Sequence, residues 1–275
     1  MYRRVLLLCD LEGVNNVVGE PYLGLSKGTD QWRIAAEQAA LELNAAADAL
    51  FAAGVETVGV WDNHGGGENI DPSRLDPRIH LHAIDKTRPR MYFAQGAYDA
   101  VCFFGYHAME GTLGGVLAHT MNSKANQFYR LNGNYIGEVD MDAYIAAEHG
   151  IPTLFFAGGD IACSQAKRIL PEITTVITKR EISRNEAQFR DNAELLADIR
   201  QGITAALCKS IAPSKLSFPA TFEKSFKRVE DAALYLVRLT RSGIAADYPA
   251  DEILGRDAHT VVSTVKSMKE FIICI

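Results

Sequence analysis

The 275-residue sequence has little of what marks membrane-embedded, exported or nucleic-acid-binding proteins. No run approaches the ~20 apolar residues that span a bilayer. The apolar run after Arg3 and Arg4 ends at Asp10, whereas the apolar core of a signal peptide needs ~7–15 residues. The formal charge is −6, with 28 basic against 34 acidic residues and no block of like charge. We therefore expect neither nucleic acid nor a membrane as the main partner.

Cysteines are few and scattered, and they form no C-x-x-C pair. An odd number in such positions does not suggest a disulfide framework, and a free cysteine in an apolar run behaves as a small hydrophobic residue. A reduced, cytoplasmic setting is the simplest interpretation. The five are Cys9, Cys102, Cys163, Cys208 and Cys274.

Several common catalytic and binding motifs are also missing. The sequence contains no G-x-x-x-x-G-K-[ST] and no G-x-G-x-x-G, so nucleotide binding by those routes has no support. It lacks the H-E-x-x-H pair of many zinc proteases, and its G-x-S-x-G match, Gly24 to Gly28, does not follow a predicted strand as the elbow of serine hydrolases does. Any enzymatic activity must therefore use a different arrangement of residues.

The composition is that of a globular protein, with 48% hydrophobic and 23% charged residues. Short apolar runs alternate with longer amphipathic ones, which is typical of βαβ units. We expect an α/β fold: a three-layer α/β/α arrangement with a mostly parallel sheet. Strands are predicted at 5–9, 55–61, 79–84, 100–105, 153–157 and 174–178, a hairpin around Asn132-Gly133 at 128–136, and helices at 31–53, 140–149, 161–170 and 185–207.

The composition changes near residues 211–214. This change predicts a metal-binding catalytic domain at 1–210 and a smaller C-terminal α+β region at 211–275. The C-terminal region could equally be continuous with the first domain. Within it, a strand is expected at 216–222 and helices at 230–239 and 259–272.

Carboxylates and imidazoles follow the ends of four predicted strands. In open α/β sheets ligands bind outside the carboxyl ends of the strands, so these side chains are expected to converge. Carboxylates and imidazoles without a thiolate suit Zn²⁺, Mn²⁺ or Fe²⁺ better than Ca²⁺ or Mg²⁺. The predicted ligands are Asp10 and Glu12 after the first strand, His64 after the second, His107 after the strand at 100–105, and Glu138 after the hairpin.

The spacing of Asp10 and Glu12 supports a shared site. Residues i and i+2 of an extended segment point to the same side, so both carboxylates can face one metal centre. A bridging carboxylate could also hold two cations ~3.5–4 Å apart.

Each of these residues also has an ordinary structural interpretation. Asp10 could be a turn residue, His64 could cap the glycine turn that follows it, and His107 could be a hydrogen-bonded core histidine. Glu138 could be the first-turn carboxylate of the following helix. His119 could be a further ligand, a general acid or base, an oxyanion stabiliser, or a packed strand residue. The joint occurrence at strand ends favours the functional interpretation for the first four.

The same segments resemble a known family. In order and approximate spacing they are similar to the motif series of the D-aminopeptidase DppA family of metallopeptidases, from the first strand to about Arg184. The resemblance is faint over the C-terminal region. The segments are Cys9-Asp10-Leu11-Glu12-Gly13, Trp61-Asp62-Asn63-His64, Gly105-Tyr106-His107-Ala108, His119-Thr120-Met121 and Gly137-Glu138, with Ala157-Gly158-Gly159-Asp160 and Ile182-Ser183-Arg184 also similar.

The resemblance implies a particular site and assembly. It implies that the five ligands named above bind a pair of zinc ions, that His119 is the catalytic residue, and that copies assemble into ring-shaped homo-decamers. The sequence departs from the family pattern at Cys9, where serine is common, and at Asp142, where asparagine is usual. These departures leave the ligands intact but change their surroundings.

Our leading hypothesis is a zinc-dependent aminopeptidase. It would remove the N-terminal residue of short peptides, including D-amino-acid peptides, with a metal-activated water. A metal-dependent amidase or phosphoesterase is the second hypothesis, and Lys86, Arg88 or Lys124 near the site would favour an anionic substrate. A non-catalytic peptide-binding protein with a structural metal is the third, and closed coordination would favour it.

Overall fold

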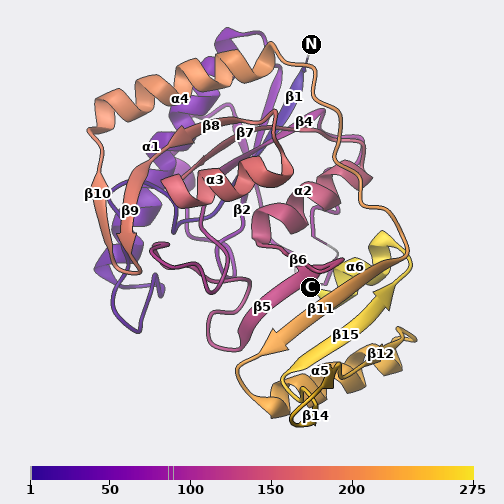
Figure 1. The fold of residues 1–275 in the computed structure, drawn as a ribbon. Helices are drawn as coiled ribbons and strands as arrows, with labels where there is room; N and C mark the ends of the chain where they lie inside the picture. Colours follow the sequence, from indigo (N-terminus) through magenta and orange to yellow (C-terminus); the bar gives the residue numbers. More distant parts are fainter. Residues whose placement is uncertain (1, 86, 89) are drawn as a thin grey trace.

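The structure is a computed structural model that describes residues 2–85, 87–88 and 90–275. Its centre is a six-stranded parallel sheet in the order β3-β2-β1-β4-β7-β8 (Figure 1). Parallel strands covered on both faces are rich in apolar residues, which is why the central strands at 5–9 and 100–105 are continuous apolar runs. The strands are β1 Arg4–Cys9, β2 Thr57–Asp62, β3 Ile79–His82, β4 Ala100–Tyr106, β7 Thr153–Gly158 and β8 Thr174–Ile177.

Helices cover both faces of this sheet. Val5 and Leu7 of β1 belong to the core beneath α1 and α4, whereas Leu6 and Leu8 belong to the opposite core with α2 and α3. The alternation follows from the two-residue period of a strand. The expected three-layer α/β/α fold is therefore confirmed. The helices are α1 Asp30–Ala52, α2 Glu138–Glu148, α3 Asp160–Ile169 and α4 Asn192–Leu207, and a short 3₁₀ helix, η1, spans Pro72–Arg74.

A second, antiparallel sheet lies beside α2 in the order β12-β15-β11-β5-β6 (Figure 1). It pairs strands from the middle of the chain with strands from beyond residue 211, since β11 lies between β5 and β15. Whether residue 210 divides two domains stays a prediction. The elements are β5 Asn126–Leu131, β6 Asn134–Tyr135, β11 Ala220–Phe226, β12 Ala246–Asp247, β15 Thr260–Val265, α5 Val229–Arg241 and α6 Met268–Cys274, with a small hairpin of β13 Ala250–Asp251 and β14 Gly255–Arg256.

Two predicted helices were wrong in part. The helix expected at 185–207 begins only at Asn192, where the Asp191 side chain accepts a hydrogen bond from Glu194 N. The residues before it form the hairpin of β9 (Lys179–Ser183) and β10 (Glu186–Phe189). The helix expected at 259–272 is β15 followed by α6. Residues 260–265 are mostly β-branched, which favours a strand, and they pair with β11 over their whole length.

Other predicted boundaries differ from the observed ones by a few residues. The strand expected at 216–222 begins at Ala220, directly after Pro219, which has no backbone N–H for a sheet ladder. The hairpin at Asn132 and Gly133 is confirmed, because both residues have the positive φ that a tight hairpin turn needs.

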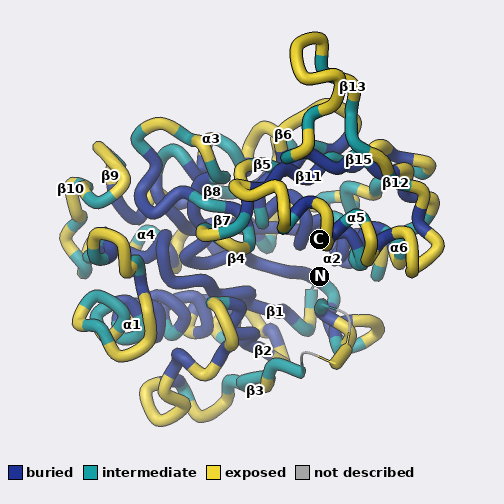
Figure 2. The backbone as a smooth tube through the Cα atoms, turned by 90° about the horizontal axis from the view of Figure 1, so that it is seen from below, coloured by how far each residue is buried: buried dark blue, intermediate teal, exposed yellow. Residues whose placement is uncertain are grey.

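The most deeply buried part of the chain includes the two central strands of the parallel sheet. The central strands β4 and, after Arg4, β1 are dark blue in Figure 2, while many of the outer loops are exposed. Within the described residues, none of the helices combines the length and apolar character needed to cross a bilayer.

Candidate metal centre

The candidate site lies where the strand order reverses. The chain continues to β2 and β3 on one side of β1, and to β7 and β8 on the far side of β4. In doubly wound sheets this switch point opens a crevice at the carboxyl ends of the two central strands. Asp10 directly follows β1 and His107 directly follows β4, so both face this crevice.

Two glycines bring the segments after β1 and β4 together. Gly105 has a φ of +68°, and a Cβ there would lie 2.0 Å from the Asp10 carbonyl oxygen. A Cβ on Gly13 would lie 2.1 Å from the Tyr106 carbonyl oxygen. The two glycines are joined by a 2.6 Å hydrogen bond from Gly13 N to Gly105 O. No larger residue could occupy these positions without moving Asp10 and His107 apart.

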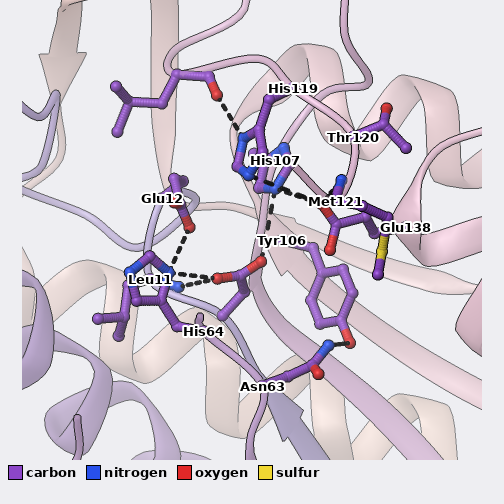
Figure 3. Close-up of polar contacts among 12 residues, drawn as sticks. Leu11, Glu12, Asn63, His64, Tyr106, His107, His119, Thr120, Met121 and Glu138 are labelled. Carbon is purple, nitrogen blue, oxygen red and sulfur yellow. Dashed lines mark hydrogen bonds and ion pairs between the residues drawn. The ribbon is translucent and has the colours of Figure 1, made fainter. Parts of the chain in front are cut away.

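The predicted residues converge in one cluster, in which Asp10, Glu12 and His107 are buried and the other two are half-buried (Figure 3). His64 Nδ1 lies 3.0 Å from Asp10 Oδ1 and 3.1 Å from Glu12 Oε2. His107 Nε2 lies 3.5 Å from the other oxygen of Asp10 and 3.4 Å from Glu138 Oε1. Asp10 therefore touches both histidines, which is the position that a bridging carboxylate requires.

Each imidazole of the cluster is held by a backbone carbonyl on its other nitrogen. His107 Nδ1 donates to Ala108 O at 2.9 Å, and His119 Nδ1 donates to Leu117 O at 2.9 Å. His64 Nε2 makes a longer contact of 3.4 Å with Leu25 O. A carbonyl on one nitrogen fixes the tautomer and leaves the second nitrogen as the ligand atom, which is the usual arrangement of metal-binding histidines.

His107 shows most directly that the cluster fits a metal. Its Nε2 atom is buried and has no hydrogen-bond partner among the described residues. A core histidine that served packing alone would have both nitrogens satisfied. Ligand atoms within 4.8 Å of one another form two groups that meet at this residue: Asp10, Glu12 and His107, and His107, His119 and Glu138.

The charges of the cluster require positive partners. Burial and the nearby charge of Glu12 raise the pKa of Asp10 to about 7. Burial disfavours the charged form of Glu138, but the close approach and the charge of His107, at 3.4 Å, outweigh it and lower the pKa of Glu138 to about 2. Burial likewise opposes protonation of His107, yet its carboxylate neighbours raise its pKa to about 10. Divalent cations would take the place of these imidazole protons.

His119 and Glu138 occupy the end of the cluster away from His64. The rings of His107 and His119 stack at 3.9 Å with an interplanar angle of 11° (Figure 3). His119 Nε2 lies 3.8 Å from Glu138 Oε1. Glu138 also opens α2 and accepts a 2.7 Å hydrogen bond from Met121 N, so its role at the helix start and a role as a ligand coexist.

A buried polar network beside the cluster has no counterpart in the sequence-based prediction. Asp142, fully buried, accepts bonds from Arg90 Nε at 2.9 Å and Arg90 Nη2 at 2.7 Å. It also accepts from Tyr106 Oη at 2.7 Å and Asn63 Nδ2 at 3.1 Å. Arg90 thus explains why a charged residue is accommodated at position 142. The sequence before Arg90 shows neither helical nor strand periodicity, so no local signal indicated this residue.

Lys179 is a second residue that the sequence did not single out. It is fully buried at the start of β9, and its ammonium donates to the carbonyls of Glu12 at 2.6 Å, Val14 at 2.9 Å and Val17 at 2.5 Å. Burial lowers its pKa to about 8, so it remains mostly protonated at neutral pH. One side chain thereby holds the whole segment that carries Glu12.

We expect Lys179→Met to destabilise the protein and weaken metal binding. The substitution leaves three buried carbonyls without a donor, which should lower the free energy of unfolding by about 3 kcal/mol. Denaturant unfolding of the metal-free protein and a zinc titration measure the two effects. Lys266→Met, at an exposed lysine, is the matched control. Unchanged stability and zinc affinity in Lys179→Met would contradict this role.

A cavity of about 700 Å³ opens onto the cluster. The loop that contains Tyr22 and Leu25 forms part of its wall, together with the turn that contains Arg184. Of the basic residues considered from the sequence, Lys124 lines the cavity, whereas Arg88 faces Asp85 at 3.5 Å and Tyr92. Lys86 lies outside the described residues.

Fold and cluster together define a class: a doubly wound α/β domain with a buried carboxylate and histidine site at its switch point. The sequence profile of the D-aminopeptidases, peptidase family M55, matches residues 3–243. The chain therefore belongs to the D-aminopeptidase family.

Individual relatives agree with this assignment. A D-aminopeptidase from Bacillus subtilis (strain 168) is 28% identical over 184 residues, which span 66% of this chain and 65% of that protein. The solved structure of the Zn-dependent D-aminopeptidase DppA from Bacillus subtilis, described as a self-compartmentalizing protease, matches with a TM-score of 0.83. That match covers 98% of this chain and 94% of the other at 23% identity, and it shows the shared fold.

Proposed function

We propose that this chain is a zinc-dependent aminopeptidase that removes the N-terminal residue of short peptides, D-amino-acid peptides included. The observation that carries the proposal is the unsatisfied, buried Nε2 atom of His107 among three carboxylates at the switch point. Family membership and the zinc dependence stated for the Bacillus subtilis structure support it. Mn²⁺ or Fe²⁺ would suit the same ligands.

The residues that would hold the metal are Asp10, Glu12, His64, His107 and Glu138, and Asp10 would be the carboxylate shared by two ions. Asp10 contacts both His64 and His107, which supports the bridging assignment. When bound, the zinc ions would supply the Lewis acidity that activates water and polarises the scissile carbonyl. The chain's own part is to hold the carboxylates and imidazoles in place through the Ala108 and Leu25 carbonyls and Lys179.

His119 is the proposed catalytic residue. Its Nδ1 is held by the Leu117 carbonyl, and it lines the cavity beside the ligands. In that position its other nitrogen can donate to or accept from a reacting group, as a proton shuttle or an oxyanion stabiliser.

A substrate panel tests the proposal. The purified, zinc-loaded protein should hydrolyse D- or L-aminoacyl peptides and should leave phosphoesters and simple amides intact. The alternative of a phosphoesterase or amidase predicts the reverse preference. The alternative of a peptide-binding protein with a structural metal predicts zinc binding and no hydrolysis of any member of the panel.

Assembly of several copies is part of the proposal. The self-compartmentalizing character stated for the Bacillus subtilis structure supports a homo-oligomer, and the family resemblance supports a decamer. Light scattering on the purified protein gives the number of copies directly. All five cysteines are free, which supports a reduced, cytoplasmic setting.

A further inference from the structure

The cavity beside the cluster is lined by both acidic and basic side chains. Three carboxylates of the proposed metal site and Glu20 line it, and three basic side chains line the same cavity. A short peptide carries the same two charges, an ammonium at one end and a carboxylate at the other. The basic residues are Arg90, Lys124 and Arg184.

Arg90 is already neutralised by the protein. Its guanidinium makes two hydrogen bonds to the fully buried Asp142 and a third, of 3.1 Å, to Asn63 Oδ1. If Arg90 turned towards a substrate, the buried carboxylate of Asp142 would be left without a compensating positive charge. Arg90 therefore belongs to the scaffold of the site.

Arg184 is placed differently. It lies in the turn between β9 and β10, where its Nη1 donates to Ala118 O at 2.7 Å and its carbonyl accepts from Leu117 N at 2.9 Å. These two bonds fasten it to the segment that carries His119. Among the described residues no carboxylate forms an ion pair with Arg184, and the guanidinium has five N–H donors.

Lys124 follows His119 in the chain, whereas Arg184 is fastened to the two residues before His119. The Asn122 side chain accepts a 3.0 Å hydrogen bond from Lys124 N, which fixes the local turn. Its side chain is exposed and lines the cavity, and it too forms no ion pair with the residues that the structure describes. Two cations without an ion-pair partner among the described residues thus line the same cavity as His119 and the carboxylates of the cluster.

We propose that Arg184, assisted by Lys124, binds the C-terminal carboxylate of the peptide substrate. This inference rests on the proposed aminopeptidase function and narrows its substrate class to short peptides with a free C-terminus. A guanidinium recognises a carboxylate through two parallel hydrogen bonds, which give both strength and orientation. With the carboxylate held there, the N-terminal peptide bond of a short peptide extends towards His119 and the metal ligands.

The test compares each peptide as a free acid and as its C-terminal amide. Alanine peptides of increasing length, in D and L forms, are hydrolysed by the zinc-loaded protein, and kcat/KM is measured for each member of a pair. The wild-type protein should prefer the acid by about tenfold to hundredfold at the shortest active length. In Arg184→Gln the ratio of acid to amide should fall towards one, and Arg184→Lys should keep part of the preference.

The ratio of kcat/KM for the acid to kcat/KM for the amide does not depend on the fraction of active protein. Partial misfolding of a variant therefore does not affect it. Arg180→Gln is the matched control, because Arg180 lies on the same strand β9 but lines a different cavity. It should keep the wild-type ratio. If Arg184→Gln hydrolyses neither form, Arg184→Lys and Lys124→Gln supply the ratio.

The outcomes separate the inference from the function on which it rests. Equal hydrolysis of acid and amide by the wild type, or an unchanged ratio in Arg184→Gln, overturns the inference and leaves the aminopeptidase intact. Hydrolysis of neither form by the zinc-loaded wild type overturns the proposed function and the inference together.

Discussion

Stripping the protein of metal with a chelator should reduce peptide hydrolysis by about three orders of magnitude. The bound cations are proposed to activate the water and polarise the carbonyl, and a contribution of several kcal/mol to the barrier corresponds to a loss of this size. The carboxylates and imidazoles that remain provide no equivalent Lewis acid. The measurement is the initial rate on one peptide before and after dialysis against the chelator.

Addition of zinc should restore the activity. We expect the titration to reach its plateau at about two ions per chain, because one oxygen of Asp10 contacts His64 and the other contacts His107. A plateau at one ion would exclude the dinuclear site while leaving the enzyme in place. Chelator already saturated with zinc is the control, and it should cause no loss. Full activity in protein shown to be metal-free would rule out the metal mechanism.

His119→Ala should lower kcat by a factor of about 10²–10⁴ and leave the zinc content unchanged. His119 lines the cavity, its orientation is held by the Leu117 carbonyl, and its free nitrogen lies 3.8 Å from Glu138 Oε1. Loss of this ring removes a group that handles a proton or stabilises an oxyanion. The five proposed ligands all remain. Steady-state kinetics and metal analysis on the same preparation measure both quantities.

The metal content decides between two roles for this histidine. His119 belongs to one of the two groups of ligand atoms, so it could also bind an ion. If His119→Ala loses one zinc equivalent, the residue is a ligand and the catalytic assignment is wrong. If kcat is unchanged, it has neither role. His149→Ala, at the C-terminus of α2, is the control and should behave as wild type.

Several elements could be predicted from the sequence because their signals are local. The strands β1, from Val5 onward, and β4 are apolar, since both of their faces are covered, and such runs are visible without any knowledge of their neighbours. Asp10 and His107 follow these strands directly, so the rule on carboxyl ends predicted their proximity. The tight hairpin at Asn132 and Gly133 has equally local causes.

The errors arose where distant segments decide the local conformation. Residues 186–189 have side chains that suit a helix, but they pair with β9. By contrast, residues 260–265 are mostly β-branched, so their own composition already favoured the strand that they form beside β11. Propensity is a weak guide when strand partners are far away in the chain, since the pairing contributes more than the intrinsic preference.

The sequence alone therefore determined the parallel α/β core and the residue types gathered at its carboxyl edge. Only the tertiary structure decided what surrounds them: Arg90 against Asp142, Lys179 beneath the segment that carries Glu12, and Arg184 fastened beside His119. The physical reason is the range of the interactions. Hydrophobic periodicity and turn chemistry act over a few residues, whereas a buried ion pair or a carbonyl anchor joins groups dozens of positions apart.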